Sequence, residues 1–84
     1  EKKALENLIL KLSEIKKNLK PEEIQTIVYA TGKENGYAEN LRDWFKLIYE
    51  VVFGEENGPR MGYFVSFFGL KETIELMKDK IKNN

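Results

Sequence analysis

The fold is decided by residues 41–62, LRDWFKLIYEVVFGEENGPRMG. The apolar run up to Phe53 is too long for an ordinary strand, and a glycine follows it, so it predicts a helix. This helix starts near Asn40, which can cap it, and its apolar residues lie on more than one face, which predicts burial on several sides. After the turn 54–58, Pro59 suits the first position of another helix, which we expect to reach Phe68.

Two further helices precede this pair. The first is expected from about residue 3 to 18, because apolar residues recur there at three- and four-residue steps. The residue before Pro21 is pushed out of the α region, and proline suits a helix start, so a second helix is expected from Pro21 to about Glu34. Asn35 and Gly36 are its stop signal. The stripe of the first helix consists of Leu5, Leu8, Ile9, Leu12, Ile15 and Leu19.

A fifth helix follows Gly69, which ends the fourth. It carries Leu70, Ile74, Met77 and Ile81 on one face. The sequence shows no internal repeat or interdomain linker, so residues 1–84 are predicted to form a single all-α domain, a compact bundle of about five helices. The large aromatic residues are expected in its core, because a domain this small needs them to fill it. They are Trp44, Phe45, Phe53, Phe64, Phe67 and Phe68.

The composition excludes much chemistry. The sequence has no His and no Cys, so a Ser-His triad, a thiolate nucleophile and zinc-finger ligands are ruled out. Adjacent acids such as Glu55 and Glu56 are ordinary turn residues, which argues against a small carboxylate enzyme. We expect no catalytic, cofactor-binding or metal-binding residue here, and no membrane contact. The chain begins at Glu1 and its first methionine is Met61, which predicts a fragment of a longer, cytoplasmic protein.

The net charge of zero hides an uneven distribution. Residues 1–20 contain six Lys and three Glu, whereas residues 21–43 are acidic on balance. Lys11, Lys16 and Lys17 are interpreted first as solvated helix positions and second as a phosphate-binding stripe.

One motif points to a family. Residues 47–62 contain Ile48-Tyr49, a glycine-ended apolar stretch and then Gly58-Pro59-Arg60-Met61-Gly62, and a helix ending in Gly69 follows. This pattern resembles the C-terminal end of class I lysyl-tRNA synthetases over about residues 20 to 82, and more weakly that of glutamyl-tRNA synthetases. The resemblance implies the terminal, all-helical, anticodon-binding part of a synthetase. The parent enzyme would join lysine to its tRNA with ATP and magnesium, at catalytic motifs that are absent here.

The resemblance also implies that Tyr49 and the segment Gly58-Pro59-Arg60-Met61 lie against anticodon bases. Splayed bases are recognised by stacking and by hydrogen bonds to their edges. Gly58 would allow close backbone approach, Arg60 a planar donor fork, and Met61 an apolar ledge, with free N–H groups near residue 62. Two further residues are expected as weaker RNA contacts, namely Tyr63 and Lys71.

Other interpretations stay open. Gly58-Pro59 can be a turn device, Arg60 a surface ion-pairing residue, and Tyr49 a core residue with its hydroxyl at the rim. The whole chain can be a helical protein-interaction or structural domain that binds no RNA, or the corresponding domain of a glutamyl-tRNA synthetase-like enzyme. The expected partners are lysine tRNA and the remainder of a parent synthetase, with the chain a monomer.

Overall fold

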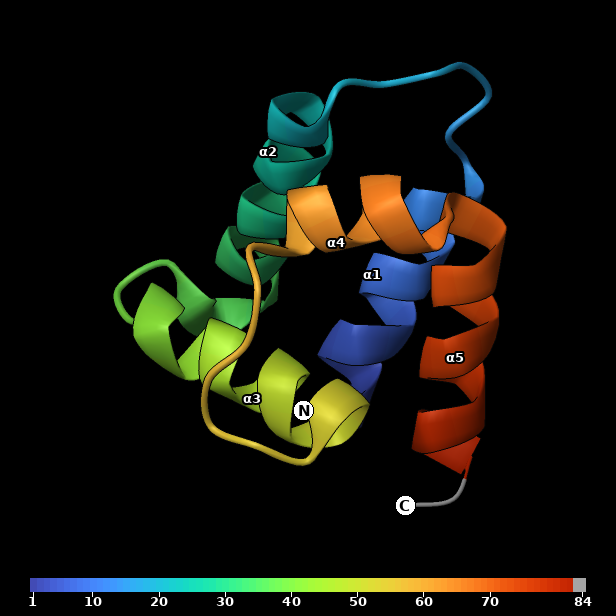
Figure 1. Ribbon diagram of the computed structural model, residues 1–84. Helices are drawn as coiled ribbons and strands as arrows, with labels where there is room; N and C mark the ends of the chain where they lie inside the picture. The colour runs from blue at the N-terminus through green and yellow to red at the C-terminus, as the bar shows by residue number, and fades with distance from the viewer. Residues whose placement is uncertain (83–84) are drawn as a thin grey trace.

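The computed structural model describes residues 1–82, which form an all-α bundle. No strand occurs in this range, and the prediction of about five helices is confirmed. In Figure 1, α4 lies across the bundle between α2 and α5, with α1 behind it and α3 below. The helices are α1 (Lys2–Ser13), α2 (Pro21–Gly32), α3 (Leu41–Phe53), α4 (Met61–Phe68) and α5 (Leu70–Lys82), with a π-type turn at Lys33–Tyr37 after α2.

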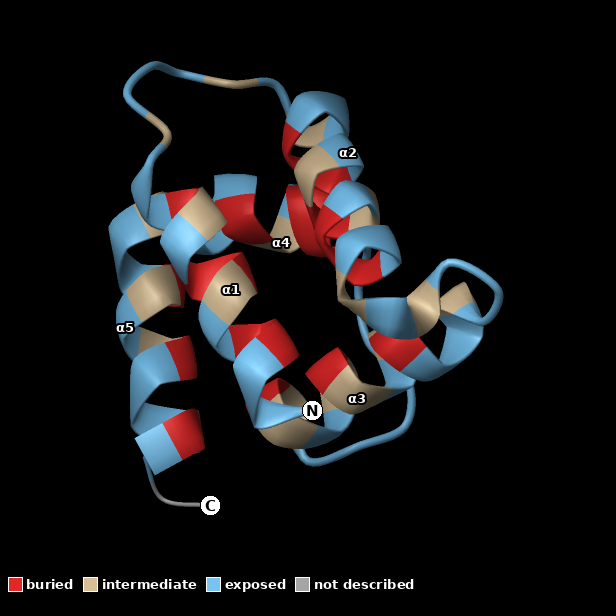
Figure 2. Ribbon diagram, turned by 180° about the vertical axis from the view of Figure 1, so that it is seen from behind, coloured by how far each residue is buried: buried red, intermediate tan, exposed pale blue. Residues whose placement is uncertain are grey.

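The core draws on all five helices, whose buried faces point inward in Figure 2. Trp44 lies at the meeting point of α2 and α3 and is fully buried. Its indole Nε1 donates a hydrogen bond of 2.9 Å to the carbonyl of Val28, so the polar atom of this large side chain is satisfied. Gly32 packs directly on the indole, where a Cβ would lie 2.7 Å from Cγ of Trp44. These contacts join α2 to α3.

The predicted helix stops are confirmed at three glycines. The backbone leaves helical geometry at Asn35 and Gly36, where Gly36 has φ 96°. Gly54 ends α3 in the left-handed conformation, with φ 74°, and Gly69 separates α4 from α5 with φ 112°. Positive φ is inexpensive for glycine, so the sequence marks these boundaries directly.

The prediction for the first helix is wrong at its end. α1 stops at Ser13, whose hydroxyl donates to the carbonyl of Leu10 at 2.7 Å, and residues 14–20 form a connecting segment that arches to α2 (Figure 1). Ile15 and Leu19 are still half-buried against the core. Their spacing therefore matches the period of a helix, although they reach the core from a non-helical segment.

The fourth helix begins two residues later than predicted. Arg60, at φ −58° and ψ 127°, is the residue before the helix, and Pro59 lies outside it. The start is set by α2, because the side chain of Gln25 accepts a hydrogen bond of 2.6 Å from the backbone N–H of Gly62. The first residue of α4 therefore depends on a contact with α2 and not on Pro59.

The predicted burial of α3 and of the aromatic residues is only partly right. Full burial of α3 is confined to Trp44, Ile48 and Val52, whereas its other apolar residues are half-buried against the core, so the prediction of burial on several sides holds only in part. Phe67 is 91% exposed and Phe68 44% exposed, so neither is a core residue. Phe67 lies two positions after buried Val65, about 200° around the helix, and therefore faces solvent.

We predict that Gly62→Ala destabilises the protein. A Cβ at this position would collide with the backbone carbonyl oxygen of Pro21 and lie 2.8 Å from the backbone nitrogen of Gln25. Alanine favours a helix by about 1 kcal/mol over glycine, but forcing two backbones apart costs more, so the free energy of unfolding should fall by about 2 kcal/mol. Urea denaturation measures this change. Ser66→Ala, at an exposed position of the same helix, should change it by under about 0.5 kcal/mol, and equal effects of the two substitutions would contradict the packing argument.

Candidate nucleic-acid interface

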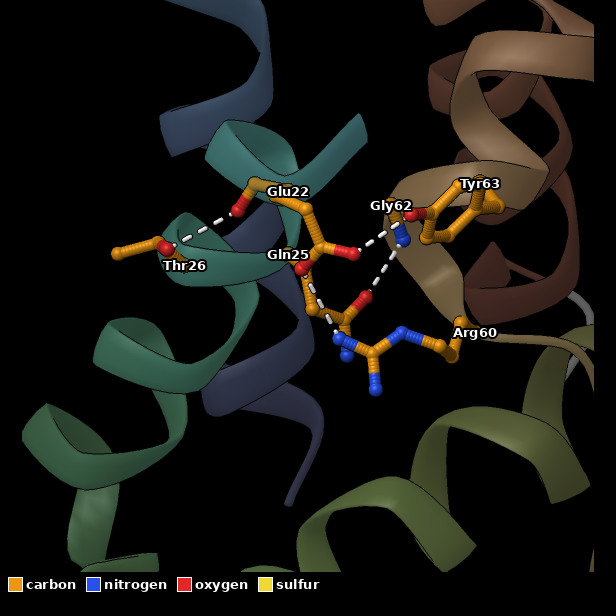
Figure 3. Close-up of polar contacts among 6 residues, drawn as sticks. All are labelled: Glu22, Gln25, Thr26, Arg60, Gly62 and Tyr63. Atoms are coloured by element: carbon orange, nitrogen blue, oxygen red, sulfur yellow. Dashed lines mark hydrogen bonds and ion pairs between the residues drawn. The ribbon is translucent and has the colours of Figure 1, made fainter. Parts of the chain in front are cut away.

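A polar cluster joins the first turn of α2 to the start of α4 (Figure 3). Oε1 of Glu22 accepts a hydrogen bond of 3.1 Å from Nη2 of Arg60, and Oε2 accepts one of 2.7 Å from the hydroxyl of Tyr63. We call these three residues the Glu22 cluster. Its side chains are largely exposed, with 53% for Arg60 and 62% for Glu22. Just beneath it, Gln25 binds the buried amide of Gly62.

The contacts of this cluster lower the pKa of Glu22 and raise that of Tyr63. The hydrogen bond from Tyr63 is the main cause that holds the pKa of Glu22 below its ordinary value, and the positive charge of Arg60 acts in the same direction. The bond to the Glu22 carboxylate raises the pKa of Tyr63, since it holds the phenolic proton in place. The cluster is therefore stable as an ionised carboxylate between two donors.

A pocket of about 270 Å³ lies beside α3. Four lining residues come from α3 at positions i, i+3, i+4 and i+7, and two from the following loop. Two positive side chains face one negative side chain there, so the pocket is locally basic in a protein of zero net charge. We call it the α3 pocket, and it is lined by Arg42, Phe45, Lys46, Tyr49, Glu56 and Asn57.

Aromatic rings connect the α3 pocket to α4. Phe45 packs edge-on against Tyr29 with centroids 5.1 Å apart, and its ring lies 6.3 Å from that of Tyr49. Phe53 continues this series and meets Phe64 of α4 edge-on at 4.9 Å. Such pairs contribute about 0.5–1.5 kcal/mol each beyond area burial. The rings at the pocket are therefore held by neighbours on both sides.

The loop before α4 brings the α3 pocket close to the Glu22 cluster. Gly58 lies against the ring of Tyr49, where a Cβ would be 2.8 Å from Cδ1, so this loop position has little room for a side chain. Burial and the neighbouring Tyr29 raise the pKa of Tyr49, whereas the positive charge of Arg60 lowers it. Asn57 of the α3 pocket and Arg60 of the Glu22 cluster are three residues apart in this loop, so the loop joins the two sites.

The predicted site residues are divided between the α3 pocket, the Glu22 cluster and exposed positions outside both. Tyr49 and Gly58 are in contact, and Arg60 and Tyr63 are joined through Glu22. Arg60 is an ion-pairing residue, as the simpler interpretation predicted. Pro59 is exposed in the loop, and Lys71 is exposed in the first turn of α5.

Two details of the predicted site are corrected. Met61 is 1% exposed and packs in the core, so the apolar ledge expected there is not accessible. The backbone N–H of Gly62 is buried and bonded to Gln25, so it is not a free donor. Both differences follow from the packing of α4 on α2.

Sequence reasoning missed the basic side of the α3 pocket. Arg42, Phe45 and Lys46 share a helix face with Tyr49, a spacing that could have signalled an aromatic surface flanked by cations. Asn57 could not be recognised as a site residue, because the loop geometry brings it to the pocket. Glu22 could not be recognised either, because it meets Arg60 only where α2 and α4 cross.

The N-terminal lysines lie elsewhere. Lys11 of α1 forms an ion pair of 3.2 Å with Glu34, which lies in the π-type turn after α2. Lys16 and Lys17 are exposed on the segment between α1 and α2. Within the described residues, no cluster of three or more acidic side chains converges to hold a metal ion, and no helix has the length and apolar character that a bilayer span requires.

Comparison with known proteins finds similarity to lysine--tRNA ligases. The chain is 40% identical over 77 residues, 92% of its length, to the lysine--tRNA ligase of Rickettsia felis. It is 36% identical over 80 residues to that of Rickettsia bellii and 38% identical over 77 residues to that of Rickettsia prowazekii, covering 95% and 92% of this chain.

The chain spans only 14–15% of the length of these curated relatives. It is therefore similar to a domain-sized segment of lysine--tRNA ligases. No protein-family model matches the sequence, and no solved structure matches it.

We predict that the pKa of Glu22, measured by NMR titration of its side-chain carboxyl, lies below the ordinary value of about 4.3. Tyr63→Phe should raise it, because the largest cause of the shift is lost. A lowered pKa in the folded state stabilises the protein above the unfolded pKa. The stability advantage of the original protein over Tyr63→Phe should therefore be complete at neutral pH and disappear as the pH falls through the folded pKa. An identical carboxyl pKa in both proteins would contradict the assigned role of the hydroxyl.

Proposed function

We propose that this chain binds the anticodon loop of a lysine tRNA, as the anticodon-binding domain of a class I lysyl-tRNA synthetase. The observation that carries the proposal is the α3 pocket, where aromatic rings, two cations and an amide converge. Its support from known proteins is the similarity to segments of lysine--tRNA ligases.

The chemistry of the pocket suits single-stranded RNA. Unpaired bases stack on aromatic side chains, and Phe45 and Tyr49 supply such surfaces. Arg42 and Lys46 can neutralise the backbone phosphate of the same nucleotide, and the amide of Asn57 can donate to or accept from a base edge. The volume lies just below the usual lower limit of about 300 Å³ for small-ligand pockets, which favours one inserted base over a larger ligand.

Arg60 provides the second element of recognition. Uridine presents two carbonyl acceptors and one imino donor, and the guanidinium carries several donors in a fixed plane. Arg60 follows the pocket residue Asn57 by three positions in the same loop, so a base in the α3 pocket and a neighbouring base near the guanidinium would be bound together. The chain would contribute affinity and tRNA identity. ATP, magnesium and the joining of lysine to tRNA would belong to the rest of the parent enzyme.

A second candidate is a protein-interaction domain. It is favoured by Phe67 and Phe68 at the end of α4, which are 91% and 44% exposed, because aromatic residues are enriched at protein interfaces. If RNA binds and the NMR signals of Phe67 do not change, the first candidate is supported. If a protein binds and the signals of the α3 pocket do not change, the second is supported.

We predict that Lys46→Gln weakens binding of an anticodon stem-loop RNA uniformly across sequences and reduces the slope of log affinity against log salt by about one. Fluorescence titration at several salt concentrations measures both quantities. Lys78→Gln is the matched control, since Lys78 lies on α5 beside a different depression. Equal losses for the two variants would remove the α3 pocket from the RNA interface.

We predict that Arg60→Lys lowers discrimination between a lysine anticodon loop and one whose anticodon uridines are replaced by cytidines. Lysine keeps the charge but loses the planar fork, so a base-edge contact should cost about 1–3 kcal/mol of discrimination. The measurement is the ratio of the two dissociation constants. An unchanged ratio would mean that Arg60 contacts phosphate alone.

A further inference from the structure

The Glu22 cluster is more than a stabilising contact between helices. All its side chains are substantially exposed, and exposed ion pairs contribute little to stability. The crossing of α2 and α4 already has a buried contact beneath the cluster, where Gln25 binds Gly62. The buried contact thus joins the two helices, and the main structural effect of the exposed cluster is to order Arg60 at the surface.

Glu22 orders Arg60 without occupying the whole guanidinium. The contact is made through Nη2 alone, although a carboxylate and a guanidinium can form two parallel hydrogen bonds. The second oxygen of Glu22 is taken by Tyr63, which fixes the orientation of the carboxylate. Figure 3 shows the other terminal nitrogen of Arg60 directed away from Glu22. Arg60 is thus held in one orientation with donors still available.

Glu22 also changes the electrostatics of Arg60. A carboxylate 3.1 Å from the guanidinium offsets its charge at long range, whereas the remaining N–H groups keep their direction. Sequence-independent RNA binding depends on net positive charge, and base recognition depends on aimed donors. Neutralising Arg60 therefore weakens the first kind of contact more than the second.

We infer that Glu22 is a specificity-determining residue, which positions Arg60 for a base edge and suppresses attraction to RNA of any sequence. Tyr63 supports it by holding the carboxylate. This inference rests on the proposed function and adds a residue that neither the sequence motif nor the α3 pocket contains.

The test is Glu22→Gln, measured with a lysine anticodon stem-loop and with the loop whose anticodon uridines are replaced by cytidines. We expect the variant to bind the altered loop more tightly, to lose roughly fivefold or more in discrimination, and to show a salt slope steeper by about one. Glu23→Gln is the matched control. It removes the same charge one residue away, but its carboxylate contacts the backbone N–H of Lys20 instead.

A second variant separates positioning from charge. Tyr63→Phe keeps the Glu22 carboxylate but frees its orientation, so we expect reduced discrimination with an unchanged salt slope. Thermal unfolding and the amide spectrum of the core verify that each variant is folded. If Glu22→Gln does not fold, Tyr63→Phe alone decides the question, and full discrimination in it would overturn the inference.

The outcomes are distinguishable from failure of the proposed function. If the original protein binds selectively but Glu22→Gln and Glu23→Gln share one discrimination ratio and one salt slope, the role of Glu22 is overturned and anticodon binding stands. If the original protein binds neither RNA at low salt, the proposed function is overturned, and this inference with it.

Discussion

The close crossing of α2 and α4 is the constraint on which the rest of the interface depends. Gly62 has no room for a Cβ against the backbone of Pro21, and its amide is bound by Gln25. Because α4 is held in this position, Arg60 and Tyr63 lie over Glu22. The same placement packs Phe64 of α4 on Phe53 of α3. One glycine therefore aligns a polar cluster and an aromatic surface that are distant in sequence.

Much of the fold could be predicted, because several of its boundaries are local. Asn35-Gly36, Gly54 and Gly69 end helices through backbone geometry that the residue type itself favours. The misplaced boundaries were those set at long range. α4 starts at Met61, where it packs on α2. Ile15 and Leu19 reach the core from a non-helical segment, which periodicity alone cannot distinguish from a helix.

The candidate site divides in the same way. Tyr49, Gly58 and Arg60 could be recognised from a contiguous motif, and the structure places them in one region. Glu22 could not, since it is separated from Arg60 by 38 positions and meets it only after α2 and α4 pack. The prediction for Met61 was wrong because an apolar residue beside a loop can face the solvent or the core. The packing of α4 on α2 places Met61 in the core.

The burial of Trp44 has a practical consequence. It is the single tryptophan of the sequence, it is fully shielded from solvent, and its indole is bonded to the backbone of α2. Its fluorescence emission therefore reports whether α2 and α3 are packed together, and Trp44 is not among the residues that line the α3 pocket. The protein thus carries an internal optical signal for its folded state that is separate from occupation of its surface.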